Sequence, residues 1–422
     1  MKLMFTELIL GLSRALDYVE TELIGVQTNH GKRVAYLCSL LGKYAGLGRE
    51  ERLDLAACAV LHDNALSEYI QSEYRHGREI THGIPEKNMG IHCTLGERNV
   101  KDFPFFGNCE GAVLYHHENA DGSGPFSKRE GEISLYAACI HLADQLDAKF
   151  SLKSMGNEGK AFQDKWETVR EFVQEKEGSL FGVLESSLFL ENIKRKDMEK
   201  MADNTVEDAL RAELGYVEME GMPSMEGVYF KEYSPEQLMC FSGIFAKIVD
   251  YKSTFTCAHS MGVARKAYAM GEYYGWTEEL RARFFLAGAL HDIGKLAVDV
   301  DILEKPGKLT AEEFEQMKNH ALVTWQVLCG IRGMEDISRW AAHHHEKLNG
   351  KGYPFGYDAS RLDRYERLMG CLDIYQALRE ERPYKPGKSH EETMAMMWGM
   401  AEGGFIDREL TADVDKAFRT ET

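Results

Sequence analysis

Histidine and aspartate residues recur in the same order in the two halves of this 422-residue chain. The second half carries, in order, His259, His291, Asp292, His320, His344, His345 and Asp373. The first half carries His30, His62, Asp63, His92, His116, His117 and Asp144. The steps 259 to 291 and 30 to 62 both cover 32 residues, and the steps 320 to 344 and 92 to 116 both cover 24. This repeat predicts two copies of one domain.

Apolar periodicity predicts that both copies are helical. In the second copy His259, Val263, Ala267 and Met270 fall at i, i+4, i+8 and i+11, which places them on one helical face. A second stripe of this kind ends at His291. Alternating strand patterns are absent over any useful length, and only nine prolines interrupt the chain. We expect an all-α fold in which histidines and aspartates point inward from several helices.

The length of the chain suits two hydrophobic cores better than one. We expect an N-terminal domain over residues 1–150 and a C-terminal domain over residues 233–422. The stretch between them, residues 151–232, contains charged helical segments and a patch rich in glycine and methionine. It predicts a charged, partly helical connector.

A formal net charge of −18 disfavours nucleic-acid polymers and anionic membranes as partners. A small anionic substrate remains compatible with this charge, because a few cations in one cleft override the global field there. No apolar stretch approaches the length of a membrane span, and the opening segment has acids inside its apolar part, unlike a signal peptide. We expect a cytoplasmic protein.

The nine cysteines stand singly, without a CxxC pair. This arrangement favours reduced, buried thiols over disulfides or a thiolate metal site.

A lone histidine on an apolar face is most often a hydrogen-bonded core residue. Five histidines and two aspartates per copy, repeated at the same spacing, indicate metal ligands instead, because a metal satisfies all these buried polar groups together. Seven side chains exceed the needs of one ion, so we expect two divalent ions per site with Asp292 as the bridge. Imidazole and carboxylate ligands favour iron or manganese, with zinc, nickel or cobalt as alternatives. Paired ions are typical of phosphoester hydrolysis.

Glu346 and Glu118 follow the double histidines, and each is a candidate for orienting a ligand imidazole or else a surface glutamate. The repeat aligns His116 and His117 with His344 and His345, so His343 is left out of the ligand set.

The second half resembles the HD-GYP family, a branch of the HD phosphohydrolases, from about Glu236 to Pro386. The motifs that carry the resemblance are HDIGK at 291–295, His320, HHE at 344–346, GKGYP at 350–354, Asp373 and RPYK at 382–385. The family folds as a helical bundle and works in signalling. Its usual activity is hydrolysis of cyclic di-GMP, and some members act on cyclic GMP-AMP.

The resemblance implies the seven second-half ligands named above, and the first copy implies a second metal site. It further implies that Asp292 and Lys295 take part in catalysis, with Lys295 near the scissile phosphate. Tyr353, Arg382 and Lys385 would hold substrate, and Arg382 offers a guanidinium fork that matches a phosphate.

Departures from the family pattern modify this picture. Some members have a glutamate four residues before the first histidine that helps to hold a third metal; Phe255 and Val26 stand there, so two metals are expected. Gln376 replaces an aspartate common three residues after the last ligand, and Asn349 replaces another.

The first copy keeps the ligands and lacks the substrate groups. Leu66 stands where the lysine of HDIGK would be, Gly124 and Pro125 have no tyrosine between them, and no RPYK segment follows Asp144. We expect this copy to hold metal; a regulatory or structural role is favoured over a catalytic one, which stays an open alternative, and internal two-fold pairing of the two domains is a further option.

The leading hypothesis is a phosphodiesterase in which a metal-bound hydroxide opens a cyclic dinucleotide, cyclic di-GMP before cyclic GMP-AMP, to its linear form. Two alternatives remain open: an HD phosphohydrolase that acts on another nucleotide, and a non-catalytic sensor of nucleotide or metal.

Overall fold

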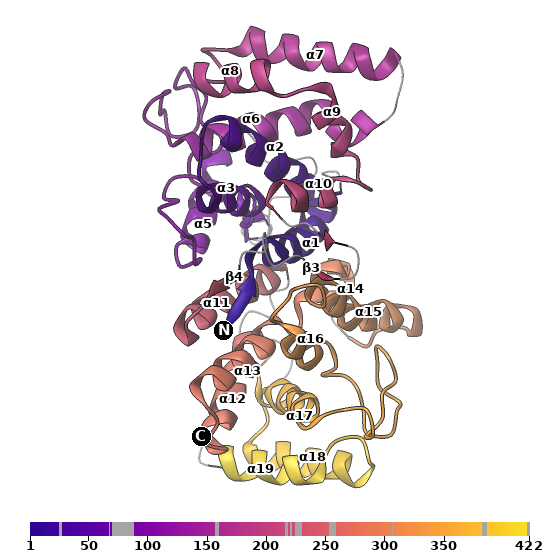
Figure 1. Ribbon diagram of the computed structural model, residues 1–422. Helices are drawn as coiled ribbons and strands as arrows, with labels where there is room; N and C mark the ends of the chain where they lie inside the picture. Colours follow the sequence, from indigo (N-terminus) through magenta and orange to yellow (C-terminus); the bar gives the residue numbers. More distant parts are fainter. Residues whose placement is uncertain are drawn as a thin grey trace. The chain divides into compact units, whose positions relative to one another are not determined.

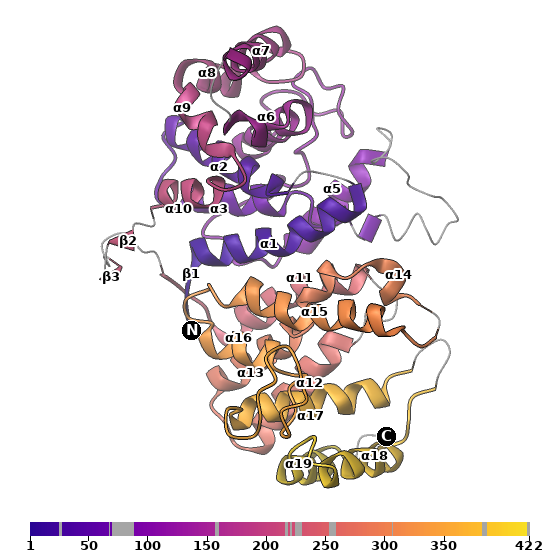
Figure 2. The same cartoon turned by 90° about the vertical axis from the view of Figure 1, so that its right-hand side faces the viewer.

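The computed structural model describes residues 1–24, 28–66, 68–69, 88–156, 160–215, 218–219, 222–223, 230–252, 259–305, 307–381 and 386–419. It separates into two compact units (Figures 1 and 2). One unit comprises Met4–Lys231, and the other comprises Glu232–Thr422 together with Met1–Leu3. In the second unit the Tyr233 backbone amide donates to the Met1 carbonyl over 2.8 Å, which joins the chain start to this unit. Within the described residues the regular secondary structure is almost all helical, as the periodicity predicts.

The N-terminal unit holds one set of helices and short 3-10 segments. In chain order these are α1 (Phe5–Ile24), α2 (His30–Tyr44), α3 (Arg49–Leu61), α5 (Met89–Val100), α6 (Leu135–Phe150), η2 (Leu152–Gly156), α7 (Lys160–Lys176), α8 (Val183–Asn192), α9 (Arg195–Met198), η3 (Glu199–Met201) and α10 (Val206–Glu213). Helix α2 lies against α3, α6, α8 and α10 and is buried along almost its whole length. The segment expected to be a connector therefore supplies helices that pack on α2 and α6.

The C-terminal unit is built in the same way. It contains α11 (Pro235–Lys252), α12 (His259–Tyr273), α13 (Glu278–Leu290), η4 (Ile293–Ala297), α14 (Val300–Leu303), α15 (Ala311–Leu328), α16 (Glu335–Ala342), α17 (Arg364–Arg379), α18 (His390–Glu402) and α19 (Arg408–Phe418). Helix α13 lies against α11, α12 and α16, and α17 lies against α12, α16, α18 and α19. The predicted face of α12 is confirmed, since His259, Val263, Ala267 and Met270 are all buried.

Strands are short wherever they occur in the described chain. They are β1 (Lys2–Met4), β2 (Glu218–Met219), β3 (Met222–Pro223) and β4 (Phe230–Glu232), paired β1 with β4 and β2 with β3. The β2–β3 pair is antiparallel, with Glu218 opposite Pro223.

Local sequence sets where the ligand-bearing helices begin. At the start of α15 the Thr310 hydroxyl accepts from the Glu313 amide, while the Glu313 carboxylate accepts from the Thr310 amide over 2.7 Å. Asp363 and Glu366 form the same reciprocal cap at the start of α17. These caps satisfy backbone amides that the first helical turn leaves without partners. They fix the residues at which the two helices that carry His320 and Asp373 begin.

The eight cysteines in the described part of the chain are all free, and five of them are buried. None of the described helices is both long and apolar enough to cross a bilayer.

Candidate metal centres

Seven side chains from five places in the C-terminal unit meet in one buried cluster. Their positions are the first residue of α12 (His259), the two residues between α13 and η4 (His291 and Asp292), α15 (His320), the turn after α16 (His344 and His345) and α17 (Asp373). All are buried except His345, which is half-buried. Every second-half ligand predicted from the sequence therefore lies in the cluster.

Asp292 lies between two groups of ligand atoms. Its Oδ2 atom is 3.1 Å from His291 Nε2 and 4.0 Å from His259 Nε2. Its Oδ1 atom is 3.5 Å from His320 Nε2 and 4.0 Å from His344 Nε2. The two oxygens of one carboxylate thus face different histidine pairs, as a bridging ligand would.

Asp373 and His345 complete the two groups. Asp373 Oδ1 is 3.0 Å from His259 Nε2 and 3.8 Å from His291 Nε2, on the first side of Asp292. Asp373 Oδ2 is 3.8 Å from His345 Nδ1, and the His345 ring lies 4.0 Å from the His344 ring. The cluster is therefore divided into two half-sites of imidazole and carboxylate atoms.

The ring nitrogens are oriented as metal ligands require. The Nδ1 atoms of His291, His320 and His344 lie 2.7, 2.6 and 2.6 Å from the backbone carbonyls of the residues three positions earlier. Donation from Nδ1 leaves the Nε2 lone pair free to point into the cluster. His291 Nε2 is fully buried and makes no hydrogen bond of good geometry with the described residues. The donor set fits divalent transition-metal ions.

The pKa values of the clustered histidines and of Asp373 also fit metal binding. Burial lowers the pKa of His345 to about 3, and burial together with His345 lowers the pKa of His344 well below its usual range. Burial alone would raise the pKa of Asp373, but the His259 hydrogen bond and the nearby histidines outweigh it and hold that pKa well below its usual range. Neutral imidazoles and ionised carboxylates are the forms that bind metal.

His259 behaves differently because two carboxylates flank it. Burial alone would lower its pKa, yet hydrogen bonds with Asp373 and Glu380 raise it to about 9. Without an ion this imidazole carries a proton near neutral pH, so binding of an ion there must release that proton.

Glu380 is a residue that the sequence reasoning missed. Its Oε2 atom lies 3.2 Å from His259 Nδ1. In the N-terminal unit Asp147 Oδ2 lies 2.7 Å from His30 Nδ1. Asp147 follows the ligand Asp144 by three residues, where the C-terminal copy has Gln376. The carboxylate one helical turn further along, Glu380, thus makes the contact.

A second residue difference between the copies accompanies the different position of this carboxylate. In the N-terminal copy Arg33 Nε donates to Asp147 Oδ1 over 2.8 Å. Gly262 occupies the matching place in α12, and a Cβ atom there would lie 2.3 Å from the Gln376 side chain. The arginine and aspartate of one copy are replaced by a glycine and a glutamine in the other. Glu380 follows Asp373 by seven residues, a spacing that keeps both on one face of a helix. This spacing is the sequence signal that could have revealed the role of Glu380.

The HDIGK segment holds the bridge in place. Gly294 lies against α15 so closely that an added Cβ would be 1.9 Å from the His320 carbonyl oxygen. The Gly294 amide donates to Thr324 Oγ1, and that hydroxyl donates to the His291 carbonyl, each over 3.0 Å. Lys295 Nζ donates to Asp292 Oδ2 over 2.6 Å. The predicted lysine therefore lies at the cluster.

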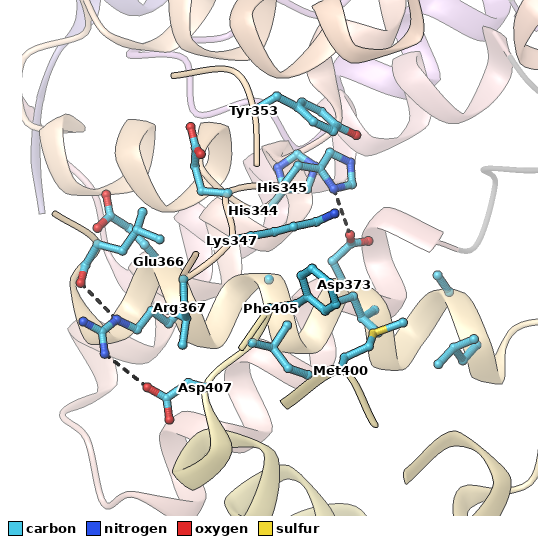
Figure 3. Close-up of a pocket in the computed structure, with 18 of the residues that line it drawn as sticks. His344, His345, Lys347, Tyr353, Glu366, Arg367, Asp373, Met400, Phe405 and Asp407 are labelled. Atoms are coloured by element: carbon cyan, nitrogen blue, oxygen red, sulfur yellow. Dashed lines mark hydrogen bonds and ion pairs between the residues drawn. The ribbon is translucent and has the colours of Figure 1, made fainter. Parts of the chain in front are cut away.

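A cavity of about 530 Å³ opens beside the cluster (Figure 3). Its lining includes the predicted ligands His344, His345 and Asp373 and the predicted Tyr353, whose ring centroid lies 4.7 Å from that of His345. Lys347 and Phe405 also line it, and Lys347 Nζ lies 5.4 Å from the Phe405 ring centroid. The volume is within the range of small-molecule sites, about 300–1,000 Å³. Arg382 and Lys385 lie outside the described residues.

The N-terminal cluster repeats this arrangement. Asp63 Oδ2 is 3.4 Å from His62 Nε2, while Asp63 Oδ1 is 3.4 Å from His92 Nε2 and 3.7 Å from His116 Nε2. Asp144 lies 3.3 Å from His30 Nε2 and 3.9 Å from His117 Nδ1. All seven predicted first-half ligands meet here. Leu66, at the position of Lys295, is a buried apolar side chain.

The glutamates after the double histidines do not orient imidazoles in either copy. The Glu346 carboxylate accepts from the backbone amides of Phe355, Gly356 and Tyr357 over 2.7, 3.1 and 2.9 Å. Glu118 accepts from Phe126 and Lys128 in the same manner. Both are buried rather than surface residues, and each ties down the loop that follows it. Sequence adjacency to a ligand does not decide where a side chain points.

His343 lies outside the cluster, as the repeat predicts. Its Nδ1 atom is 2.6 Å from Glu366 Oε1, and its ring stacks on Trp325 with centroids 5.7 Å apart.

Fold and site together define a helical protein with two His/Asp clusters suited to metal ions. Two family models match the chain, both described as HD domain, one over residues 28–149 and the other over residues 244–410. The chain belongs to the HD-domain family and carries two HD domains in tandem, the second with the HD-GYP motifs.

The chain is also similar to several named proteins and to a solved structure. The 3'3'-cGAMP-specific phosphodiesterase 1 of Vibrio cholerae is 28% identical over 94% of this chain and 88% of its own length. The 3'3'-cGAMP-specific phosphodiesterase 3 of Vibrio cholerae is 37% identical over 43% of this chain and 39% of its own length. A cyclic di-GMP phosphodiesterase of Thermotoga maritima is 32% identical over 39% of this chain and 45% of its own length. The crystal structure of a cyclic GMP-AMP specific phosphodiesterase from V. cholerae covers 100% of this chain, with a TM-score of 0.63 and 22% identity, which shows likeness of fold.

Proposed function

We propose that the C-terminal copy is a metal-dependent phosphodiesterase that opens a cyclic dinucleotide to its linear form. The observation that carries this proposal is the position of Asp292, whose two oxygens face separate histidine pairs beside a cavity of about 530 Å³. Two divalent ions held there would supply Lewis-acid polarisation of a phosphoryl group and a nucleophile at neutral pH. The proposed ligands are His259, His291, Asp292, His320, His344, His345 and Asp373.

The chain's own residues would bind and orient the substrate. Lys295, held by Asp292 at the cluster, would stabilise charge that develops on the scissile phosphate. Tyr353 and Phe405 offer aromatic faces on which bases can stack, and Lys347 adds a cation to a strongly acidic protein. Arg382 and Lys385 are proposed as further phosphate contacts on the strength of the family motif.

The choice of substrate rests on the relatives. The relative that matches most of this chain is named as specific for 3'3'-cGAMP, whereas shorter matches include cyclic di-GMP phosphodiesterases. Both cyclic dinucleotides are therefore substrates to assay, with 3'3'-cGAMP first.

We propose a supporting role for the N-terminal copy. It keeps all seven ligands, and a cavity of about 770 Å³ beside its cluster is lined by His117, His141 and Gln145. Leu66 offers no cation to a phosphate, and no tyrosine stands between Gly124 and Pro125. This copy would bind metal without turnover. The cytoplasmic location, the identity of the ions and the pairing of the two domains stay predictions.

The deciding experiment is hydrolysis of both cyclic dinucleotides by protein loaded anaerobically with iron or with manganese. Wild type is compared with Asp292→Ala and with Asp63→Ala, and metal content is measured for each. We expect turnover by wild type and by Asp63→Ala, and loss of turnover in Asp292→Ala. Loss in both variants would mean that the two sites are coupled.

The same assay separates the alternatives. Preference for a mononucleotide in a substrate panel would replace the proposal with a general HD phosphohydrolase. Tight binding of a cyclic dinucleotide without turnover, in wild type with full metal occupancy, would replace it with a sensor.

A further inference from the structure

The N-terminal cluster contains a thiol that the C-terminal cluster lacks. Cys93 follows His92 in α5 and is fully buried. Its sulfur lies 3.6 Å from His92 Nε2, the nitrogen that faces Asp63. At the corresponding position, after His320, the C-terminal copy has the buried apolar residue Ala321.

The thiol belongs to a compact group of ligand atoms. One atom from each of His92, Cys93, His116 and His117 lies within 4.8 Å of every other. The His92 and His116 Nε2 atoms are 3.4 Å apart. Three nitrogens and one sulfur are thus close enough to surround a single small ion.

These separations match the edges of a tetrahedral zinc site. With zinc to nitrogen bonds of about 2.0–2.1 Å and a zinc to sulfur bond of about 2.3 Å, tetrahedral angles require about 3.4 Å between nitrogens and about 3.6 Å between nitrogen and sulfur. The separation of 3.4 Å between the His92 and His116 Nε2 atoms and that of 3.6 Å between Cys93 Sγ and His92 Nε2 agree with these two values.

A second observation also points to a ligand in this cluster. His62 Nε2 is fully buried, faces Asp63 at 3.4 Å and makes no hydrogen bond with the described residues. A buried ring nitrogen without a partner is costly unless something binds it. The unpartnered His62 nitrogen therefore points to ion binding in this cluster, and Cys93 lies at the edge of the cluster.

We propose that Cys93 is a thiolate ligand and that the half-site of His92, Cys93, His116 and His117 binds a divalent ion of the zinc class. Thiolate ligands select softer ions than imidazole and carboxylate ligands do. The N-terminal copy therefore differs from the C-terminal copy in metal preference, and zinc competes there more effectively against manganese. This inference rests on the proposed metal binding of the N-terminal copy and not on catalysis. It departs from the sequence analysis, which assigned no chemistry to cysteine.

A packing role for the thiol is the alternative that the test must separate. Cys93 Sγ also lies 3.2 Å from the Met89 carbonyl oxygen four residues earlier in α5, an ordinary contact of a helical cysteine. A thiol that only packs would bring no sulfur to the metal.

The experiment is X-ray absorption at the zinc edge on full-length protein with the C-terminal site disabled by Asp292→Ala and His344→Ala. In this background we expect a shell of nitrogen atoms together with a sulfur contribution at about 2.3 Å. Cys93→Ala, which installs the residue of the other copy, should remove the sulfur and keep the nitrogens. Cys58→Ala, at a buried cysteine of α3, is the matched control and should leave the sulfur in place.

Affinity gives a second readout. Loss of a direct ligand should weaken zinc binding at least as much as loss of a residue that orients one, on the order of 10- to 100-fold. Manganese affinity should change much less in Cys93→Ala. Circular dichroism of each variant confirms that the helices are retained.

Three outcomes overturn the inference: a shell of nitrogen and oxygen alone in the Cys93 protein, a sulfur that persists in Cys93→Ala, or no zinc bound when the C-terminal site is disabled. The last would also remove metal binding from the proposed role of the N-terminal copy. Hydrolysis by wild type would be unaffected by any of them, so failure here is distinguishable from failure of the proposed C-terminal activity.

Discussion

At the scale of single residues, the two copies reach the same imidazole orientation by different routes. Asp147 contacts His30 from the first turn after the ligand aspartate, and Glu380 contacts His259 from the second. Both side chains arise on the helix that carries the ligand aspartate or at its end. A carboxylate that holds the second ring nitrogen fixes the ring and raises its basicity toward a metal.

Glu380→Ala should weaken metal binding at the C-terminal site on the order of 10- to 100-fold, because His259 loses the partner of its Nδ1 atom. Titration with cobalt or manganese, followed spectroscopically, measures this. Gln376→Asp in the same background should restore affinity in part, since the N-terminal copy has its carboxylate at that position. Glu381→Ala, at the exposed neighbour, is the control. Equal affinities in Glu380→Ala and Glu381→Ala would show that the contact has no role.

Two described cations, Lys347 and Arg367, line the cavity with the double histidine, and Arg367 is paired with Asp407 over 3.2 Å. Lys347→Met keeps most of the aliphatic stem and removes the charge, so it should raise KM for a dianionic cyclic dinucleotide about 10-fold, the effect of about 1.4 kcal/mol. The value of kcat should change little. Lys351→Met, at an exposed lysine of the same loop, is the control. A fall in kcat at constant KM would contradict a binding role.

At the scale of elements, contacts of Glu346 and Gly352 with the backbone determine the conformation of the loop that carries Tyr353. Glu346 gathers three backbone amides of this loop, and Gly352 passes directly over the Glu346 backbone. A Cβ atom on Gly352 would lie 2.4 Å from the Glu346 Cα. Glycine is required there because of a close backbone approach.

Gly352→Ala should therefore displace the loop and lower kcat/KM on the order of 100-fold, because misplacement of a substrate-positioning group by about 1 Å has that effect. The helices should stay folded, as circular dichroism would show. Gly399→Ala in α18 is the matched control, since a Cβ there meets no atom within 4 Å. It should leave activity intact and stabilise the helix by about 0.5–1 kcal/mol. Full activity in Gly352→Ala would refute this account of the loop.

Glu366 joins α17 to the end of α16. Its carboxylate accepts from Arg339 over 3.0 and 3.1 Å and lies 2.6 Å from His343 Nδ1. Burial alone would raise the pKa of Glu366, but the contacts with His343, the Asp363 amide and Arg339 outweigh it and lower that pKa below the ordinary 4.5. A carboxylate whose pKa is lower in the folded state stabilises the fold above its unfolded pKa.

Glu366→Gln should consequently reduce the free energy of unfolding at pH 7 by about 1–3 kcal/mol. The difference from wild type should shrink as the pH falls below 4.5 through the folded pKa, because the wild-type carboxylate then becomes protonated too. Urea unfolding at a series of pH values measures both. Glu391→Gln, at an exposed residue of α18, is the control. A difference that stays constant down to pH 3 would assign the effect to packing.

At the scale of the whole molecule, each compact unit holds its own His/Asp cluster. An ion that binds the folded unit and not the unfolded chain stabilises that unit by about 2.7 kcal/mol at one hundred times its dissociation constant. Calorimetry of wild type with and without divalent metal should thus show two metal-dependent components. Asp292→Ala should abolish the shift of one, and Asp63→Ala the shift of the other. A single transition that responds equally to both variants would show that the units unfold together.

The sequence by itself determined the helical class, the duplication and the fourteen side chains that meet in the two clusters. These properties reside in spacing along the chain: a helix places i, i+4 and i+8 on one face, and a repeated order of rare, chemically apt residues identifies the side chains that must meet. The HD-GYP resemblance rested on the same local motifs, and so did the placing of Lys295 and Tyr353 at the second cluster.

Tertiary structure decided which neighbours serve those ligands. Glu380 replaces the carboxylate absent at Gln376, Glu346 holds a loop instead of an imidazole, and Cys93 faces His92. Each outcome depends on the distance between helices that are remote in sequence and on the rotation of each helix about its own axis. Periodicity specifies a face of a helix, but only packing specifies what that face meets.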